Sequence, residues 1–352
     1  MRKKINFDLD EFRNQPLPSE KEIILSWTSD RENPVVSVIC NTFNQESYIE
    51  DAIRGFLIQQ TNFPFEIIIH DDASTDRTKN IVGFYSSKYP RIIRTVFQTE
   101  NQYRQNKKPT LISSKYARGQ YLALCEGDDF WVSPKKLQSQ KDILDSYEDV
   151  DIVFHSAFMM SENGGLKLFC DHGGSQLKIG VNKVIRTGGP CMPTASIVVR
   201  RRYFDVVVKA NLEFFEKYHS GYFLQVFASL RGGALYLPEP LSVYRTQALG
   251  SWSLSIKNSS KQFKKWVLTF IEACDEAESI IGSHYGKDFE FVVRSKVLSL
   301  ANNENISVSE RRNVVKSYSY ALKMQDFFLW KLVFSKPFVH KIAKRIRSSL
   351  KK

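Results

Sequence analysis

The sequence of 352 residues predicts an α/β fold, in which a doubly wound, mostly parallel sheet is followed by a C-terminal helical extension. Three observations lead to this prediction. Short β-branched runs alternate with amphipathic helical segments in the first half of the chain, which is typical of parallel sheets. These runs are almost continuously apolar, as expected for strands buried on both faces. From about residue 258 onward the pattern is helical throughout.

Each element has its own local signal. Residues 1–33 are polar, contain Pro16 and Pro18, and predict an N-terminal arm. Asn44 is a candidate cap for the first helix of the sheet domain, with Glu46 in its first turn. A second helix is expected over residues 75–89 and a third after Ser133 and Pro134. The expected strands span residues 35–40, 65–69, 92–97, 121–125, 151–155 and 196–200.

Composition excludes several classes of protein. The chain is 42% hydrophobic and 25% charged, which is a globular balance. Its five cysteines form no C-x-x-C motif, so a disulfide scaffold or structural zinc site is not expected, and a reducing cytoplasm fits. No apolar run has the length of a membrane span. Of the net charge of +12, eight positive charges lie after Asp326, so the body is too weakly basic to predict nucleic-acid binding.

The tail, residues 336–352, has apolar residues at every fourth position and basic residues between them. A basic amphipathic helix of this kind binds anionic membrane surfaces, which predicts a cytoplasmic protein held peripherally on the inner membrane face. The alternative is a last helix that docks on the body and exposes its basic face to solvent.

Acidic residues follow two of the predicted strands. One strand ends in His70, Asp71 and Asp72, and another in Glu126-Gly127-Asp128-Asp129-Phe130-Trp131. Ligands of doubly wound sheets bind beyond the carboxyl ends of the strands. Glu126 and Asp128 are alternate residues with a glycine between them, and hard oxygen ligands suit Mg²⁺ or Mn²⁺. The alternative is a solvated acidic loop.

These segments, with their spacing, resemble glycosyltransferase family 2, whose fold is called GT-A. The resemblance rests on the strand VSVIC with Asn41 to Glu46, on residues 66–76, and on residues 117–131, which carry an EGDD motif followed by aromatic residues. It covers residues 34–160 well and is weaker through residues 244–253. The resemblance implies a GT-A domain over residues 34–255, with a nucleotide-sugar half (34–160) and an acceptor half (161–255). A helical extension (256–335) and the tail would then follow.

The resemblance also implies a nucleotide-sugar donor, a divalent ion (Mn²⁺ or Mg²⁺) on its diphosphate, and inversion at the sugar carbon. Thr42 and Phe43 would flank the nucleobase and ribose, Asp71 or Asp72 would bind the base, and Glu126 and Asp128 would hold the metal. Trp131 would stack on the sugar or else anchor the loop from the core. Arg118 would meet the diphosphate or else be an ordinary surface charge. The full set of expected donor-binding residues is Thr42, Phe43, Asn44, Glu46, Asp71, Asp72, Arg118, Asp128, Asp129 and Trp131.

One position departs from the family pattern. The family places an aspartate general base before an aromatic residue at a helix start, and that position here is Gly221. Glu213, Glu216 and His219 are the nearby candidates for a replacement base. The sequence thus predicts an inverting, metal-dependent glycosyltransferase that extends a surface polysaccharide or lipid-linked glycan. The alternative is a catalytically degenerate GT-A protein that binds a nucleotide or a partner.

Overall fold

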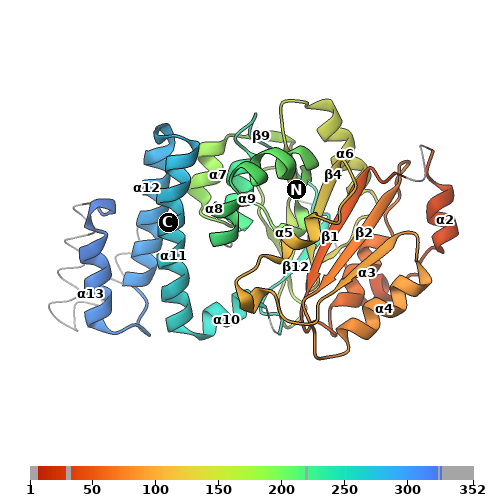
Figure 1. The fold of residues 1–352 in the computed structure, drawn as a ribbon, viewed down its shortest axis with the longest axis horizontal. Coiled ribbons are helices and arrows are strands. Elements are labelled where there is room, and N and C mark those ends of the chain that lie inside the picture. The colour runs from red at the N-terminus through yellow and green to blue at the C-terminus, as the bar shows by residue number, and fades with distance from the viewer. Residues whose placement is uncertain (1–6, 29–32, 219–220, 250, 324–325, 327–352) are drawn as a thin grey trace. The chain divides into compact units, whose positions relative to one another are not determined.

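The computed structural model describes residues 7–28, 33–218, 221–249, 251–323 and 326. It divides into two compact units, Met1–Ser255 and Ile256–Lys352. Figure 1 shows the sheet and its helices in the first unit and a set of long helices in the second. The tail and the base candidate His219 lie outside the described residues.

The first unit is built on an eight-stranded sheet of order β3-β2-β1-β4-β10-β6-β11-β9. Its first four strands are mutually parallel, whereas β10 and β9 run antiparallel to their neighbours. The predicted fold class is confirmed, and the sheet is parallel in its first half and mixed in its second. In order, the strands are β3 (Ile93–Phe97), β2 (Phe65–Asp71), β1 (Val36–Thr42), β4 (Tyr121–Glu126), β10 (Val198–Arg200), β6 (Ile152–His155), β11 (Ala234–Leu237) and β9 (Leu177–Ile179).

The first unit also contains a four-stranded sheet, whose strand β5 directly follows the acidic segment in the sequence. Its strands, in spatial order, are β5 (Phe130–Trp131), β12 (Ser242–Arg245), β7 (Ala157–Met160) and β8 (Leu166–Phe169). The helices of the first unit are α1 (Leu9–Asn14), α2 (Glu20–Leu25), α3 (Ile49–Leu57), α4 (Thr78–Lys88), α5 (Pro109–Ser114), α6 (Lys136–Ser146), α7 (Val181–Thr187), the π-helix η3 (Tyr203–Val208), α8 (Leu212–Lys217) and α9 (Gly221–Ala228). α10 (Trp252–Asn258) crosses the boundary between the units.

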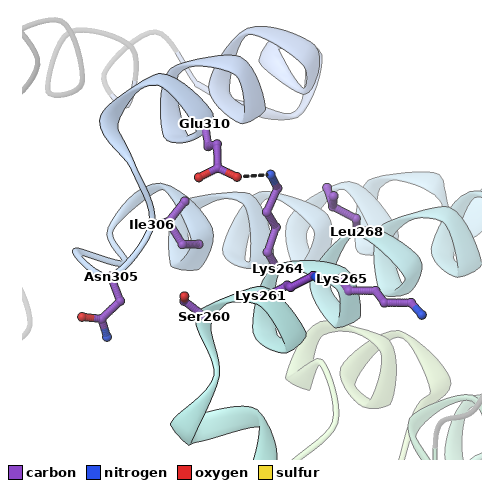
Figure 2. A pocket seen from close by; sticks show the side chains of 8 residues that line it. All are labelled: Ser260, Lys261, Lys264, Lys265, Leu268, Asn305, Ile306 and Glu310. Carbon is purple, nitrogen blue, oxygen red and sulfur yellow. Dashed lines mark hydrogen bonds and ion pairs between the residues drawn. The ribbon is translucent and has the colours of Figure 1, made fainter.

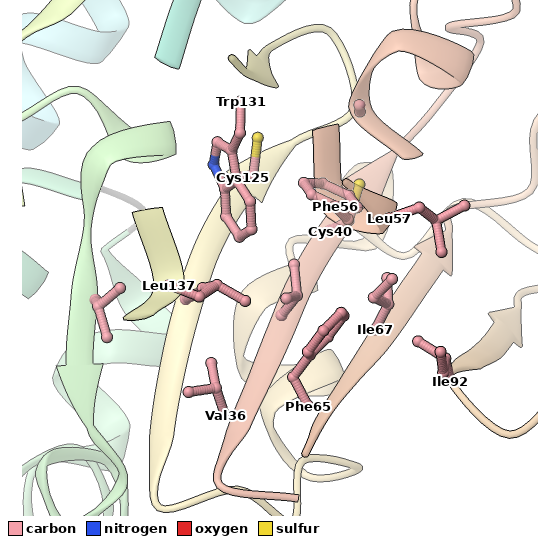
Figure 3. Packing of buried hydrophobic residues seen from close by; sticks show 14 of the residues in the cluster. Val36, Cys40, Phe56, Leu57, Phe65, Ile67, Ile92, Cys125, Trp131 and Leu137 are labelled. Carbon is pink, nitrogen blue, oxygen red and sulfur yellow. The ribbon is translucent and has the colours of Figure 1, made fainter. Parts of the chain in front are cut away.

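The main core lies between the parallel strands and the helices that cover them (Figure 3). β1 and β2 contribute Val36, Cys40, Phe65 and Ile67, all within 1% of complete burial. Complete burial of such side chains stabilises the fold by about 1.5–3 kcal/mol each. The N-terminal arm joins the same core, because Trp27 packs edge-on against Phe65 with ring centroids 5.8 Å apart. The arm is thus packed on the domain.

An amine is buried in this core. The Lys136 side chain is completely buried, donates to the Gln140 side chain at 2.7 Å, and places its nitrogen 3.9 Å from the centre of the Trp131 ring. Loss of hydration lowers the pKa of Lys136 to about 7. An unfolded lysine titrates near 10.4, so folding at neutral pH favours release of this proton.

Lys136→Met is therefore expected to change the pH dependence of stability. Between about pH 7 and 10 the unfolded chain holds a proton on Lys136 that the folded chain has lost, so this group makes stability rise with pH. The stability of the variant relative to the parent should fall by about 2 kcal/mol from pH 7 to pH 9. Urea unfolding of both proteins at the two pH values measures this difference. Equal differences at both values would contradict the depressed pKa.

The second unit is helical, as predicted. Its long helices α11 (Ser260–Ile281), α12 (Gly286–Ala301) and α13 (Val308–Ser317) pack in sequence order (Figure 1). Ser307 caps α13, because its hydroxyl accepts the backbone N–H of Glu310 at 3.3 Å. Among the residues that the structure describes, no helix combines the length and the apolar character that a bilayer crossing requires.

A hollow of about 550 Å³ opens in this unit, with Lys264 paired to Glu310 at 2.6 Å on its wall (Figure 2). Its lining contains none of the site residues predicted from the sequence. The lining residues are Ser260, Lys261, Lys264, Lys265, Leu268, Asn305, Ile306 and Glu310.

Candidate active site

The carboxyl ends of β1, β2 and β4 lie side by side at one edge of the large sheet. β1 is the middle strand, so that Thr42 pairs with Asp71 on one side and Asn41 pairs with Glu126 on the other. The backbone N–H of Asp72 donates to the Thr42 carbonyl at 2.9 Å, which continues the strand contact into the loop. The structure therefore brings the two predicted acidic segments together at the edge where such sheets bind ligands.

Asn44 and Glu46 join the loop after β1 to the loop after β2. Asn44 has a φ of 51°, in the left-handed region that asparagine tolerates, and its side-chain oxygen accepts the backbone N–H of Thr75 at 2.7 Å. The Glu46 carboxylate accepts the backbone N–H of Arg77 at 2.9 Å. The prediction that Asn44 caps the following helix is wrong, because α3 begins at Ile49 and the Asn44 side chain is bound to the other loop.

Asp71 and Asp72 are both buried and both hydrogen-bonded within the chain. The Asp71 carboxylate accepts the hydroxyl and the backbone N–H of Ser74, and burial raises its pKa. The Asp72 carboxylate accepts the backbone N–H groups of Gln102 and Tyr103 at 2.7 and 3.0 Å. These two carboxylates thus shape the loops around the sheet edge.

Thr42 and Phe43 stand at the same edge. The buried Thr42 hydroxyl donates to the side-chain oxygen of Gln45 at 2.8 Å. Phe43 is half-buried, and the guanidinium of Arg104 lies 5.8 Å from the centre of its ring. A partly exposed aromatic ring beside a buried hydroxyl is suited to contact a flat heterocycle and a sugar.

The segment after β4 turns sharply at Gly127. A Cβ atom at this position would lie 2.5 Å from the Gln45 side-chain oxygen, so only glycine fits here. The turn leaves Glu126 exposed, Asp128 only 9% exposed and Asp129 buried. Three carboxylates are therefore crowded into four successive residues.

The pKa values of these carboxyls reflect that crowding. Although part of Glu126 is exposed at the sheet edge, the protein atoms packed around its carboxyl, together with the charge of Asp128, raise the pKa of Glu126 to about 7. Burial also raises the pKa of Asp128, and the pKa of Asp129 lies well above its usual range. One buried oxygen of Asp129, Oδ2, has no hydrogen-bond partner. Asp129 Oδ2 is therefore left without a donor or cation that would stabilise its ionised form.

Arg245, at the end of β12, is the buried cation next to this cluster. Its backbone N–H donates to Asp129 Oδ1 and its Nη1 donates to the Asp128 carbonyl, both at 2.9 Å. Its Nη2 donates to Asp51 on α3. The sequence pointed to Tyr244 and Arg245 only through the family resemblance, and no local pattern indicated this role.

The donor-binding role predicted for Trp131 is wrong, and the alternative of a core anchor holds. The Trp131 side chain lies in the core and is completely buried (Figure 3). Its ring lies 4.7 Å from that of Phe56, and its indole N–H donates to the Ala195 carbonyl at 2.8 Å. Trp131 therefore anchors the acidic segment and cannot contact a ligand in this conformation.

The predicted contact of Arg118 with the diphosphate is also wrong. Arg118 precedes β4, so it lies at the amino end of the parallel strands, opposite to the acidic edge. Its guanidinium binds the buried carboxylate of Glu66 through Nε and Nη2, at 2.9 and 2.8 Å. It therefore neutralises Glu66 and is remote from a diphosphate bound at the acidic edge.

The base candidates remain a prediction. Glu213 and Glu216 are exposed on α8, whose Phe214 and Phe215 pack inward. Gly221 is exposed at the start of α9, and among the described residues no atom outside its chain neighbours and its own helix backbone lies within 4 Å of the place that a Cβ would take. The space for an aspartate at this position is therefore present.

Comparisons with known proteins show the family to which this chain belongs. The model of Glycosyl transferase family 2 matches residues 37–207, which include all three strand ends. An uncharacterized protein of Mycobacterium tuberculosis is 33% identical over 258 residues, covering 70% of this chain and 72% of the relative. TuaG of Bacillus subtilis, a glycosyltransferase assigned to teichuronic acid biosynthesis, is 35% identical over 114 residues, covering 32% of this chain and 42% of TuaG.

Solved structures share the fold at low sequence identity. TarS 1-349 of S. aureus, in complex with UDP, superposes with a TM-score of 0.58 at 19% identity, covering 82% of this chain and 80% of TarS 1-349. The mannosyltransferase PcManGT of Pyrobaculum calidifontis, in complex with GDP-Man and Mn²⁺, gives a TM-score of 0.50 at 16% identity, with 97% and 93% covered. This chain therefore belongs to glycosyl transferase family 2 and has the GT-A-like fold predicted from its sequence.

Proposed function

We propose that the protein is an inverting, divalent-metal-dependent glycosyltransferase. It transfers a sugar from a nucleotide-sugar donor to a polysaccharide or lipid-linked glycan. The observation that carries the proposal is the carboxylate cluster of Glu126, Asp128 and Asp129, at the sheet edge beside Thr42 and Phe43.

The residues present fit a divalent cation. The carboxyls have raised pKa values, and the buried Asp129 Oδ2 has no partner, as expected where a cation is needed for neutrality. Among the described residues, no group of three or more His, Cys, Asp or Glu side chains is arranged to hold a metal ion. An incomplete protein shell suits Mg²⁺ or Mn²⁺, because these ions commonly take phosphate oxygens as their remaining ligands. Glu126 and Asp128 would hold the ion.

The reaction needs one bond to form and one to break. An acceptor oxygen attacks the sugar carbon from the face opposite the phosphate, and the bond from that carbon to the phosphate oxygen breaks. When bound, the cation supplies stabilisation of the charge that develops on the departing diphosphate. Thr42 and Phe43 would orient the nucleoside, and the hydrogen bonds of Asp71 and Asp72 would keep the surrounding loops in place.

The proton of the acceptor hydroxyl must also be removed. Positioned bases contribute about 10²–10⁴-fold to rate. Glu213, Glu216 and His219 are the proposed substitutes for the aspartate that the family places where Gly221 stands. A binding module without catalysis is the second candidate, and the glycine at the base position favours it.

The acceptor class is inferred from relatives. TuaG is assigned to teichuronic acid biosynthesis, which is the observation on the acceptor, whereas the complex of TarS with UDP-GlcNAc bears on the donor. We extend these observations to this chain as a proposal that the acceptor is a cell-surface polymer or its lipid-linked precursor. Binding of the 336–352 tail to an anionic membrane stays a prediction from the sequence.

The function is tested with a panel of UDP- and GDP-sugars. Calorimetry with UDP and GDP is expected to show binding of one nucleotide with Mn²⁺ and none in EDTA. The matching sugar donor should release its nucleoside diphosphate slowly in water and faster with a glycan acceptor. Equal nucleotide binding in EDTA would contradict the metal site. Binding without turnover of any donor would favour the binding module.

A further inference from the structure

The N-terminal arm is connected to the acidic segment through a chain of three charged side chains. Arg13 on α1 donates to Asp51 on α3 from Nε and Nη2, at 2.8 and 2.7 Å. The same Asp51 carboxylate accepts Nη2 of Arg245. Asp51 is only 3% exposed, so a single carboxylate joins the two arginines away from solvent.

Arg245 carries this connection into the metal segment. Its Nη1 holds the Asp128 carbonyl and its backbone N–H holds Asp129 Oδ1, both at 2.9 Å. The guanidinium also lies 4.4 Å from the centre of the Phe130 ring. Because the side chain is only 8% exposed, these contacts leave Arg245 little freedom to move.

The arm also contacts the same segment through aromatic packing. Phe12, next to Arg13 in the sequence, lies 5.1 Å from Phe130 between ring centres, and Phe7 lies 5.7 Å from it. Phe130 directly follows Asp129. The arm thus meets the acidic segment at two points, one charged and one apolar.

We propose that Arg13, Asp51 and Arg245 form a charge clamp through which the N-terminal arm positions the Asp128–Asp129 turn for metal and donor. Arg13 and Asp51 are positioning residues, since they act through Arg245. Arg13 holds Asp51 in a bidentate geometry, and it supplies a second positive charge. Without it Asp51 would be balanced by Arg245 alone, and the hold of Arg245 on the turn would loosen. The link to donor binding rests on the proposed function.

Arg13→Ala tests the clamp, since Arg13 is 43% exposed on its side chain and its loss leaves Asp51 paired with Arg245. Loss of such outer-shell partners typically costs 10–100-fold in metal affinity or activity. We expect binding of UDP or GDP with Mn²⁺ to weaken by about ten-fold at a temperature where the variant is fully folded. Arg13→Lys should recover part of the affinity. The double variant Arg13→Ala/Asp51→Asn should match Asp51→Asn, because Arg13 acts through Asp51.

A second readout needs no ligand. Hydrogen exchange of residues 126–132 should accelerate about ten-fold in Arg13→Ala, because amides there are hydrogen-bonded only while the turn is held. The matched control is Arg54→Ala, which removes a hydrogen bond from α3 to the arm at the Gln15 carbonyl, and no hydrogen bond or ion pair joins Arg54 to Asp51 among the described residues. It should leave this exchange and the nucleotide affinity unchanged.

The two readouts separate the clamp from the proposed function. If Arg13→Ala speeds exchange only within the arm, or if Arg54→Ala has the same effect on residues 126–132, the arm is merely structural and the clamp is wrong. If the parent protein binds neither nucleotide with Mn²⁺, the proposed function fails, and hydrogen exchange alone decides whether the clamp exists.

Discussion

Asp128→Asn is expected to abolish metal-dependent binding of nucleoside diphosphates and to lower any glycosyl transfer by at least about 10³-fold. Charge stabilisation by a bound cation is worth several kcal/mol in such reactions, and an amide is a poor ligand for a hard cation. The fold should persist, because Arg245 holds the backbone carbonyl of residue 128 and not its side chain.

The same variant should gain stability when no metal is present. Burial raises the pKa of both Glu126 and Asp128, and at Glu126 the charge of Asp128 adds to the effect, so that its pKa reaches about 7. A carboxyl whose pKa is raised on folding makes stability fall as pH rises from its unfolded pKa, near 4, towards its folded pKa. Removing the charge at residue 128 removes its repulsion of the ionised Glu126 carboxylate. The melting temperature of Asp128→Asn at pH 7 in EDTA should therefore be higher than that of the parent.

Thermal melting with and without Mn²⁺ and a nucleotide checks both effects. The parent should be stabilised by the two ligands together, and Asp128→Asn should not respond. Asp142→Asn is the matched control, since it makes the same chemical change on an exposed carboxylate of α6 and should behave like the parent. If Mn²⁺ and nucleotide raised the melting temperature of Asp128→Asn as much as that of the parent, Asp128 would not be a metal ligand.

The second large effect concerns the base. If one of Glu213, Glu216 and His219 removes the acceptor proton, its replacement by glutamine or asparagine should lower turnover by about 10²–10⁴-fold with little change in donor affinity. The other two replacements should change turnover little. Steady-state kinetics at saturating donor, combined with calorimetry of donor binding, separates the two quantities.

Gly221→Asp is the complementary variant. Among the described residues, nothing outside the chain neighbours and the helix backbone lies within 4 Å of the place of a Cβ at 221, so a side chain can be added there. At the first position of α9 an acidic side chain also interacts favourably with the helix dipole. In a binding module this change should create turnover where the parent has none, and in an enzyme with a replacement base it should change the rate little.

Gly83→Asp, an equally open position on α4, controls for the added charge. If Gly83→Asp and Gly221→Asp showed equal turnover, the gain could not be attributed to a carboxylate at position 221.

Local patterns in the sequence were sufficient to predict the order of strands and helices in the first half of the domain. Continuous β-branched runs such as residues 36–40 form strands because only a buried sheet accommodates them. Strand direction then determined that the acids after β2 and β4 share an edge with Thr42. These features follow from neighbours in sequence and from the chirality of the chain, so they are readable without tertiary contacts.

Tertiary structure decided which polar and aromatic residues face a ligand. The sequence around Trp131 and Arg118 does not indicate their roles. Contacts with Phe56 and Ala195 show that Trp131 is a core anchor. The ion pair with Glu66 shows that Arg118 belongs to the opposite edge of the sheet. Arg245 meets Asp51 across 194 positions of sequence. The sequence by itself determined the scaffold and the place of the acidic edge, because these depend on burial patterns and strand direction. The charges that hold the edge together were decided by the tertiary fold alone, because a buried ion pair depends on which distant segments exclude water from the same point.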